Sequence, residues 1–291
     1  MQGNQKDHVM GGIGMIILSA FCFACMNVLV RLAGNIPSVQ KSFFRNLVAA
    51  GFAGMIIWKD HVPLTVKKEA RFSLAVRCLF GTIGILCNFY AVDHLLVADA
   101  SILNKLSPFF AIIFSYFLLK ERITLFQAVC VGAAFVGCLF VVKPGFENAA
   151  LFPALVGVGG GLGAGIAYTM VRKLGSMGVK GPIIVFYFSL SSCLVVVPWI
   201  MFHFTPMTLR QLVILLCAGI CAAGGQFSIT VAYTYAPANK ISIYDYSQIL
   251  FATILGYGIF GEIPDGLSFL GYALIVASSF IMFFYNRRTK V

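Results

Sequence analysis

The chain has 291 residues, of which 60% are hydrophobic and only 11% are charged. Soluble domains carry about 25% charged residues, so this composition excludes a water-soluble fold and places the chain in lipid. A net charge of +11 would point to nucleic acid in a soluble protein. Here the basic residues occupy short loops between apolar segments, as membrane topology requires, and we expect no nucleic-acid partner.

Ten apolar stretches follow one another along the chain, and each is long enough to cross a bilayer as a helix, which takes about 20 residues. The first stretch is too long for the core of a cleavable signal peptide. The longest polar connection, residues 59–71, leaves no room for a soluble catalytic domain. The expected spans are residues 12–33, 39–58, 71–92, 97–119, 124–142, 151–172, 182–203, 209–235, 239–260 and 266–285.

The first expected span carries Cys22 and Cys25, a CxxC spacing that also occurs in metal and redox sites. No second pair and no nearby histidine accompany them, and all nine cysteines lie within apolar stretches. We therefore interpret the cysteines as small buried side chains and expect no metal and no other cofactor. The same span contains no acidic residue.

Polar side chains interrupt the second and third spans. Arg45 lies in the second span, and Asn88 and Tyr90 lie in the third. Each is a candidate for lining a substrate cavity, although a single tyrosine is more often a packing or interface residue. Arg45 and Arg77 lie near enough to the span ends for their side chains to snorkel to the membrane surface.

The fourth span carries the clearest polar pattern. Ser101, Asn104, Lys105 and Pro108 follow an i, i+3, i+4, i+7 spacing, so they form one stripe on a helix. A lysine this far into a span costs on the order of 2.5–3.5 kcal/mol, and such residues mark functional sites. Because Pro108 has no N–H group, it leaves the carbonyl of Asn104 without its helical donor.

The spans of the second half carry matching features. Glycines at residues 157, 159, 160, 161, 163 and 165 of the sixth span predict close helix contact. Asp245 lies about six residues into the ninth span, beside Tyr246. Further cavity candidates are Tyr187 in the seventh span, Gln226 in the eighth, and Tyr244 and Gln248 in the ninth.

The chain also repeats itself at an offset of 141 residues. Rare residues coincide under this shift, including the only two tryptophans, Trp58 and Trp199, and the pair Glu121 and Glu262. Five helices is an odd number, so the second copy must enter the membrane from the opposite side. The sequence therefore predicts an all-α polytopic membrane protein with two inverted five-helix repeats, residues 1–146 and 147–291, and inverted repeats place the substrate site where the halves meet.

The distribution of basic residues predicts the orientation. With both termini in the cytoplasm, fourteen lysines and arginines lie on the inside and four on the outside, in agreement with the positive-inside rule. We expect a multi-pass protein of the cytoplasmic membrane, in a bacterium the inner membrane.

The repeat shift also relates the two polar stripes, because Asn104 falls on Asp245 and Lys105 falls on Tyr246. Two related stripes are most simply placed facing one central cavity. Our functional hypothesis is that Lys105, Asn104, Asp245 and Tyr246 bind the substrate there. The alternative is that Lys105 and Asp245 form an ion pair that locks the halves together without touching the substrate.

Residues 79–145 resemble the EamA domain of the drug/metabolite transporter superfamily. The markers are "FYA" near the end of the third span, "ADASILNKLSP" in the fourth, "KER" at its end, and a glycine-spaced fifth span that runs into "KPG". The second copy is similar in outline, with Ile249 where the first has Pro108. The resemblance implies two tandem domains and a transporter of small molecules, and it leaves the substrate open, since a shared fold does not imply a shared function.

These observations predict a transporter that carries a small metabolite by alternating access, as a facilitated or secondary-active process. Away from the ends of the spans, the basic residues Arg45, Arg77 and Lys105 are opposed only by Asp245, which favours an anionic or zwitterionic solute such as a carboxylate or amino acid. An organic cation or drug is the alternative cargo, and a lipid flippase or sensor is the alternative class. The chain has no HExxH or GxSxG motif, so we expect that it is not an enzyme. Coupling to a proton or another ion stays open. The oligomeric state also stays open, and a monomer is compatible with the sequence.

Overall fold

The computed structural model describes residues 4–119, 124–142, 150–235 and 242–288. Every regular element in these ranges is a helix. The first half contains α1 (Asn4–Leu32), α2 (Ser38–Lys59), α3 (Lys68–His94), α4 (Val97–Asn104), α5 (Ser107–Leu119) and α6 (Leu125–Val142). The second half contains α7 (Leu151–Ser176), α8 (Gly181–His203), α9 (Leu209–Tyr235), the 3₁₀ helix η1 (Ser242–Tyr246), α11 (Ser247–Phe260) and α12 (Gly266–Arg288).

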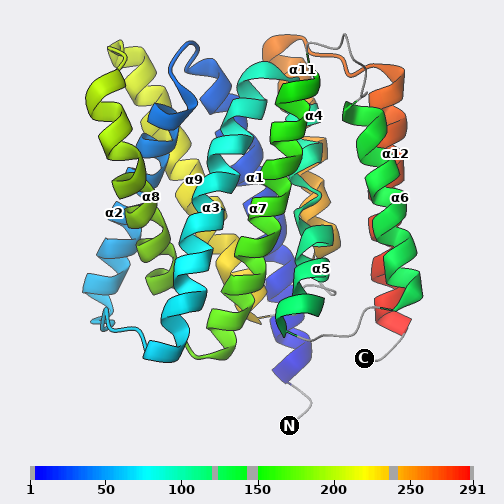
Figure 1. Cartoon of the computed structure of the whole chain (residues 1–291), viewed down its shortest axis with the longest axis horizontal. Coiled ribbons are helices and arrows are strands. Elements are labelled where there is room, and N and C mark those ends of the chain that lie inside the picture. Colours follow the sequence, from blue (N-terminus) through cyan, green and yellow to red (C-terminus); the bar gives the residue numbers. More distant parts are fainter. Residues whose placement is uncertain (1–3, 120–123, 143–149, 236–241, 289–291) are drawn as a thin grey trace.

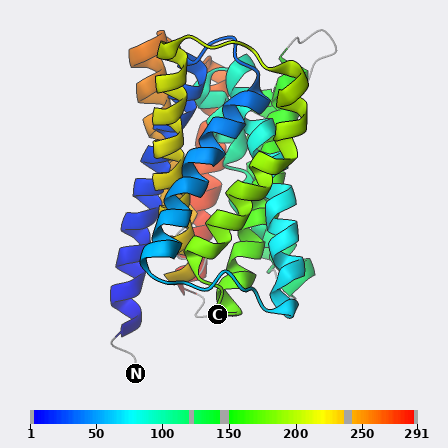
Figure 2. The same ribbon diagram turned by 90° about the vertical axis from the view of Figure 1, so that its left-hand side faces the viewer.

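Five of the helices in the described part of the chain are long and apolar enough to cross a membrane by length and composition. They span Met10–Leu32, Lys68–His94, Leu151–Ser176, Gly181–His203 and Leu209–Tyr233. The helices stand side by side in one bundle, and both chain ends lie at the same end of it (Figures 1 and 2). We call the opposite end, where α1 ends and α2 begins, the far end.

The helix bounds repeat at the offset found in the sequence. Shifted by 141 residues, both ends of α3 fall on both ends of α9, the end of α5 falls on the end of α11, and the start of α6 falls on the start of α12. The helix contacts repeat as well. The pairing of α1 with α9 corresponds to that of α7 with α3, and α2 packs on α8 and α6 on α12. Each of these interfaces joins one helix of the first half to one helix of the second.

The fourth and ninth expected spans are not continuous helices, and here the sequence-based prediction was wrong. The first is interrupted at Lys105 and Leu106, between α4 and α5, and the second begins with a 3₁₀ turn before α11. In the first half the reason is Pro108, which has no N–H group to donate to the carbonyl of Asn104 and whose ring would clash with that carbonyl in a continuous helix. Residues 239–241 of the ninth span lie outside the described part of the chain.

The glycines of α7 allow close helix contact, as expected for its neighbours α3 and α4–α5. A Cβ atom on Gly163 would lie 2.8 Å from the carbonyl oxygen of Phe80, and one on Gly161 would lie 2.7 Å from that of Leu103. A Cβ on Gly165 would lie 2.8 Å from the carbonyl oxygen of Ser107. Small residues let backbones approach in this way, so α7 packs directly on the backbone at the interruption between α4 and α5.

Candidate functional site

A small cavity lies between helices of both halves. Its volume is about 60 Å³, which is room for a few water molecules and far below the roughly 300–1,000 Å³ of typical ligand pockets. Most of its polar lining comes from asparagine, glutamine and basic side chains. The lining residues are Phe23, Met26, Asn27, Arg45, Arg77, Gly81, Gly84, Ile85, Asn88, Phe89, Asn104, Lys105, Ala164, Ala167, Tyr168, Phe188, Gln226 and Gln248.

A buried ion pair joins the two halves beside this cavity. The Nζ atom of Lys105 lies 2.6 Å from Oδ2 of Asp245, and the two side chains are 5% and 1% exposed. Lys105 follows α4 directly, and Asp245 lies in the 3₁₀ turn that precedes α11. The pair therefore lies where both interrupted spans meet. The other carboxylate oxygen of Asp245, Oδ1, is buried and has no hydrogen-bond donor among the described residues.

The interruption between α4 and α5 receives a hydrogen bond from the second half. The hydroxyl group of Tyr246 donates to the carbonyl oxygen of Lys105 at 3.0 Å. A buried carbonyl without a donor costs about 1–3 kcal/mol, so this contact stabilises the non-helical backbone. Irregular backbone at membrane depth is tolerated where protein buries it or where it lines a cavity, and both conditions hold here.

Three asparagines form a chain of hydrogen bonds along the first half. The amide of Asn104 donates to Oδ1 of Asn88 at 2.7 Å, and the amide of Asn88 donates to Oδ1 of Asn27 at 3.2 Å. The amide of Asn27 in turn donates to the Ser101 hydroxyl at 3.3 Å. This ladder connects α1, α3 and α4, and it fixes the polar wall of the cavity next to Lys105.

Arg45 and Arg77 do not snorkel, contrary to the sequence-based expectation. They are 3% and 2% exposed, and both line the cavity. The guanidinium carbon of Arg77 lies 3.9 Å from the ring centroid of Phe188, and that of Arg45 lies 5.8 Å from the same centroid. Both side chains point inward because α2 and α3 bury these faces against α8.

Other predicted site residues divide into two groups. Gln226 and Gln248 line the cavity together with Asn88 and Asn104. Tyr90 instead stacks on His94 with ring centroids 4.1 Å apart. Tyr244 is half-buried and packs against a hydrophobic cluster formed by α1, α3, α4 and α9. Tyr187 donates a hydrogen bond to the Leu64 carbonyl and lines a separate, mostly apolar groove of about 850 Å³ along α3 and α8. The three tyrosines just described, Tyr90, Tyr187 and Tyr244, do not line the cavity.

The sequence profile of the EamA-like transporter family matches the chain twice, over residues 10–143 and 151–284. The chain belongs to the EamA-like transporter family. Its relatives include the pseudopaline exporter CntI of Pseudomonas aeruginosa, which is 32% identical over 274 residues that cover 94% of this chain and 95% of the relative. This EamA protein is therefore a multi-pass membrane protein, as expected for the bacterial inner membrane.

More distant relatives are transporters as well. A riboflavin transporter of Vibrio cholerae is 25% identical, with 94% of this chain and 93% of the relative covered. Solute carrier family 35 member G1 of Mus musculus is 24% identical, with 92% and 77% covered. A crystal structure matches with a TM-score of 0.67 at 16% identity, over 98% of this chain and 99% of that chain, and supports the fold alone. The family and these relatives are transporters and not enzymes, which assigns the EamA protein to small-molecule transport.

Some cavity residues of this EamA protein were not among the predicted site residues, notably Arg77 and Asn27. A signal for Arg77 exists in the sequence. Arg77, Gly81, Gly84 and Asn88 follow an i, i+4, i+7, i+11 spacing, which places two polar and two small residues on one face of α3, and all four line the cavity. Asn27 carries no comparable signal, since Phe23, Ala24 and Val30 beside it on α1 are apolar and only Arg31 is polar.

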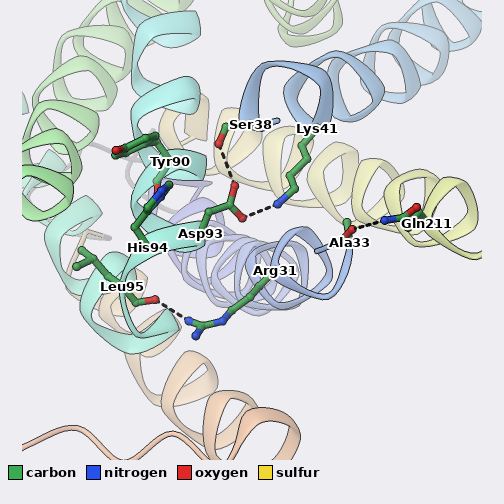
Figure 3. A network of polar contacts seen from close by, with 9 residues as sticks. All are labelled: Arg31, Ala33, Ser38, Lys41, Tyr90, Asp93, His94, Leu95 and Gln211. Atoms are coloured by element: carbon green, nitrogen blue, oxygen red, sulfur yellow. Dashed lines mark hydrogen bonds and ion pairs between the residues drawn. The ribbon is translucent and has the colours of Figure 1, made fainter. Parts of the chain in front are cut away.

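Several contacts between the halves lie at the far end of the bundle. Nη1 of Arg31 lies 2.6 Å from Oε1 of Glu262. The same atom also donates to the carbonyl of Leu95 at 2.6 Å (Figure 3). The amide of Gln211 donates to the carbonyl of Ala33, and Gln40 and Thr205 exchange two hydrogen bonds. These contacts tie α1 and α2 to the segments around α9 and α11.

A second ion pair at the far end lies within the first half. Nζ of Lys41 lies 2.5 Å from Oδ1 of Asp93, whose other oxygen accepts a hydrogen bond from Ser38 (Figure 3). The side chain of Lys41 is fully buried and that of Asp93 is 17% exposed. This pair fastens the start of α2 to the end of α3 and lies outside the cavity lining.

Proposed function

We propose that this protein is a carrier that moves a small solute by alternating access around the cavity between its two halves. The proposal includes ten membrane spans, two inverted five-helix repeats covering residues 1–146 and 147–291, and a cytoplasmic location for the end that holds both termini. The matching helix bounds at an offset of 141 residues and the pairing of α1–α9 with α7–α3 support it. So does the excess of basic residues at that end.

One observation carries the proposal: the buried Lys105–Asp245 pair joins two interrupted spans beside the cavity. Interrupted helices near the junction of repeats are where transporters place substrate and ion sites. In this conformation the cavity of about 60 Å³ is too small for a metabolite, so binding requires the halves to separate. The Arg31–Glu262 contact is one that such a movement would break at the far end.

The charges around the cavity favour an anionic or zwitterionic solute. Its lining contains Arg45, Arg77 and Lys105, and the nearby Asp245 neutralises one of the three. A cation would have to displace Lys105 from Asp245 and remain close to two further positive groups. We propose Lys105, Asn104, Asn88, Arg45, Gln226 and Gln248 as the residues that line the substrate path.

Transport by purified protein in liposomes tests the proposal. The probes are radiolabelled amino acids and carboxylates, with choline as the cationic probe. We expect flux of an amino acid or carboxylate, and loss of that flux in the variant Lys105→Met/Asp245→Asn, because the double change removes both charges and leaves no lone charge to unfold the protein. The matched control is Lys59→Met at the exposed end of α2.

Three outcomes contradict the proposal at different levels. Wild-type flux in the double variant would remove the pair from the mechanism. Flux of choline alone would assign the carrier to cations. No flux of any soluble probe, together with movement of a fluorescent phospholipid between leaflets, would assign the protein to lipid transport.

A further inference from the structure

Two arginines, Arg45 and Arg77, are buried in the bundle and take no part in the ion pair between Lys105 and Asp245. We propose that Arg45 and Arg77 form an oxyanion subsite, which holds a carboxylate or phosphate group of the cargo against α2, α3 and α8. The inference rests on the proposed transport function and adds to it the position and chemistry of one binding contact.

The geometry brings both guanidinium groups to one place. Arg45 lies on α2 and Arg77 on α3, and both contact the ring of Phe188 from α8, at 5.8 and 3.9 Å from its centroid. Both arginines and the phenylalanine line the same cavity. The arginine side chains are almost fully buried, at 3% and 2% exposure, so bulk solvent does not hydrate them.

Neither arginine has an acidic partner among the described residues, where the three ion pairs involve Arg31, Lys41 and Lys105. Arg45 donates one hydrogen bond from Nη1 to Oδ1 of Asn46, at 2.7 Å. The Nε atoms of both arginines are buried without an acceptor in the described part of the chain. Burying an unpaired ion is costly, and two like charges near one ring add repulsion. An oxyanion would satisfy these donors and offset both charges.

The subsite is distinct from the Lys105–Asp245 pair. Lys105 is neutralised at 2.6 Å by Asp245, so the uncompensated positive charge of the cavity lies with the arginines. Guanidinium groups present donors in a fork that matches carboxylate and phosphate oxygens. A cargo with one acidic group would therefore bind with that group toward Phe188.

Because Gly81 has no side chain, it leaves room for the guanidinium group of Arg77 beside the ring of Phe188. A Cβ atom at this position would overlap Nη1 of Arg77 and would lie 2.7 Å from Cε2 of Phe188. The residue lies one helical turn after Arg77 on the same face of α3. A side chain here would displace the guanidinium group from the phenyl ring, so Gly81→Ala tests the geometry without removing a charge.

The first experiment measures anion binding by the shift of the melting temperature in purified full-length protein. The probes are sodium succinate, glutamate and phosphate, with sodium chloride at equal ionic strength as the reference. We expect succinate, glutamate or phosphate to stabilise the wild type, and Arg45→Gln and Arg77→Gln each to weaken the apparent affinity at least about tenfold, as expected when a charged hydrogen bond is lost. The matched control is Arg71→Gln, an exposed arginine on the same helix, which should bind as the wild type does.

The response to the separate probes identifies the source of the oxyanion. Stabilisation by succinate or glutamate assigns the subsite to a carboxylate, and stabilisation by phosphate alone assigns it to a phosphate ester. Failure of all three anions to shift the melting temperature overturns the proposal, and so does an equal shift in Arg77→Gln. Gly81→Ala should lower the affinity as Arg77→Gln does, whereas Gly51→Ala, with nothing within 4 Å of its added carbon, should not.

A second measurement needs no ligand. In chloride alone, Arg77→Met should melt at a higher temperature than the wild type, because it removes one of two unpaired buried charges and keeps an apolar contact with Phe188. A lower melting temperature would mean that Arg77 is a structural residue and would overturn the subsite. Anion binding that persists in a protein without flux in liposomes would refute the carrier and leave the subsite intact, so the two failures are distinguishable.

Discussion

The interior of the bundle holds its charges in two different ways. Lys105 and Asp245 come from opposite halves and neutralise each other at 2.6 Å. Arg45 and Arg77 come from the same half and converge on Phe188 without an acidic partner among the described residues. A lone charge is costly in a membrane. We propose that the first arrangement holds the halves together and that the second binds a negative group of the cargo.

The largest effect should follow from breaking the neutral pair. Asp245→Asn leaves Lys105 buried without its counter-charge, and breaking a buried pair costs about 3–5 kcal/mol. We expect a melting temperature well below that of the wild type and poor recovery of monodisperse protein. The measurement is thermal unfolding followed by size-exclusion chromatography.

The double variant Lys105→Met/Asp245→Asn should recover most of that loss, because no lone charge remains. This rescue distinguishes the pair from the arginines, where removal of a single charge is expected to stabilise the protein. If Asp245→Asn melts as the wild type does, the pair contributes no cohesion and the contrast between the two arrangements disappears.

A smaller effect should follow from removing a neutral contact at the same junction. Tyr246→Phe deletes the hydroxyl that donates to the carbonyl of Lys105, which leaves a buried acceptor at a cost of about 1–3 kcal/mol. Thermal unfolding measures the loss, and Tyr257→Phe on the exposed face of α11 is the control. Equal melting of Tyr246→Phe and the control would show that the interruption of the span needs no donor from the other half.

The smallest effect is expected at the far end. The side chain of Arg31 is 28% exposed beside Glu262, so solvent and salt weaken this pair, and Arg31→Gln should cost about 1 kcal/mol or less. Thermal unfolding at low and high salt measures it, and the difference from the wild type should shrink as salt rises. A loss as large as that of Asp245→Asn would mean that the far end, and not the centre, holds the halves together.

Hydropathy and the internal repeat were sufficient to predict an all-helical membrane protein, and the markers in residues 79–145 identified the family through their resemblance to its domain. The polar stripe containing Asn104 and Lys105 was also visible, because i, i+4 spacing is a local property. The interruption at Lys105 was not predicted as such, although the proline was recognised. A proline in a helix produces either a kink or a break, and the choice depends on what packs against it, here the glycines of α7.

Arg77 was missed for a different reason. Span boundaries inferred from hydropathy begin at residue 71, which places this arginine close to a membrane surface, whereas α3 begins at Lys68 and buries it against Phe188. Tyr90 and Tyr187 show the opposite difference, because both were predicted to line the cavity and neither is among its lining residues in this structure. Their residue type suits a cavity, but which face of a helix meets the other half is a tertiary property that one sequence does not contain.

The hydrogen bond from Tyr246 to Lys105 joins two positions that are 141 residues apart, the same offset that relates the two halves. A rotation that exchanged the halves would therefore exchange these two residues with each other, so their contact lies on the axis of that rotation. In the proposed transport cycle the two halves would exchange their conformations, and a contact between positions related by the repeat would then join the same two positions before and after the exchange.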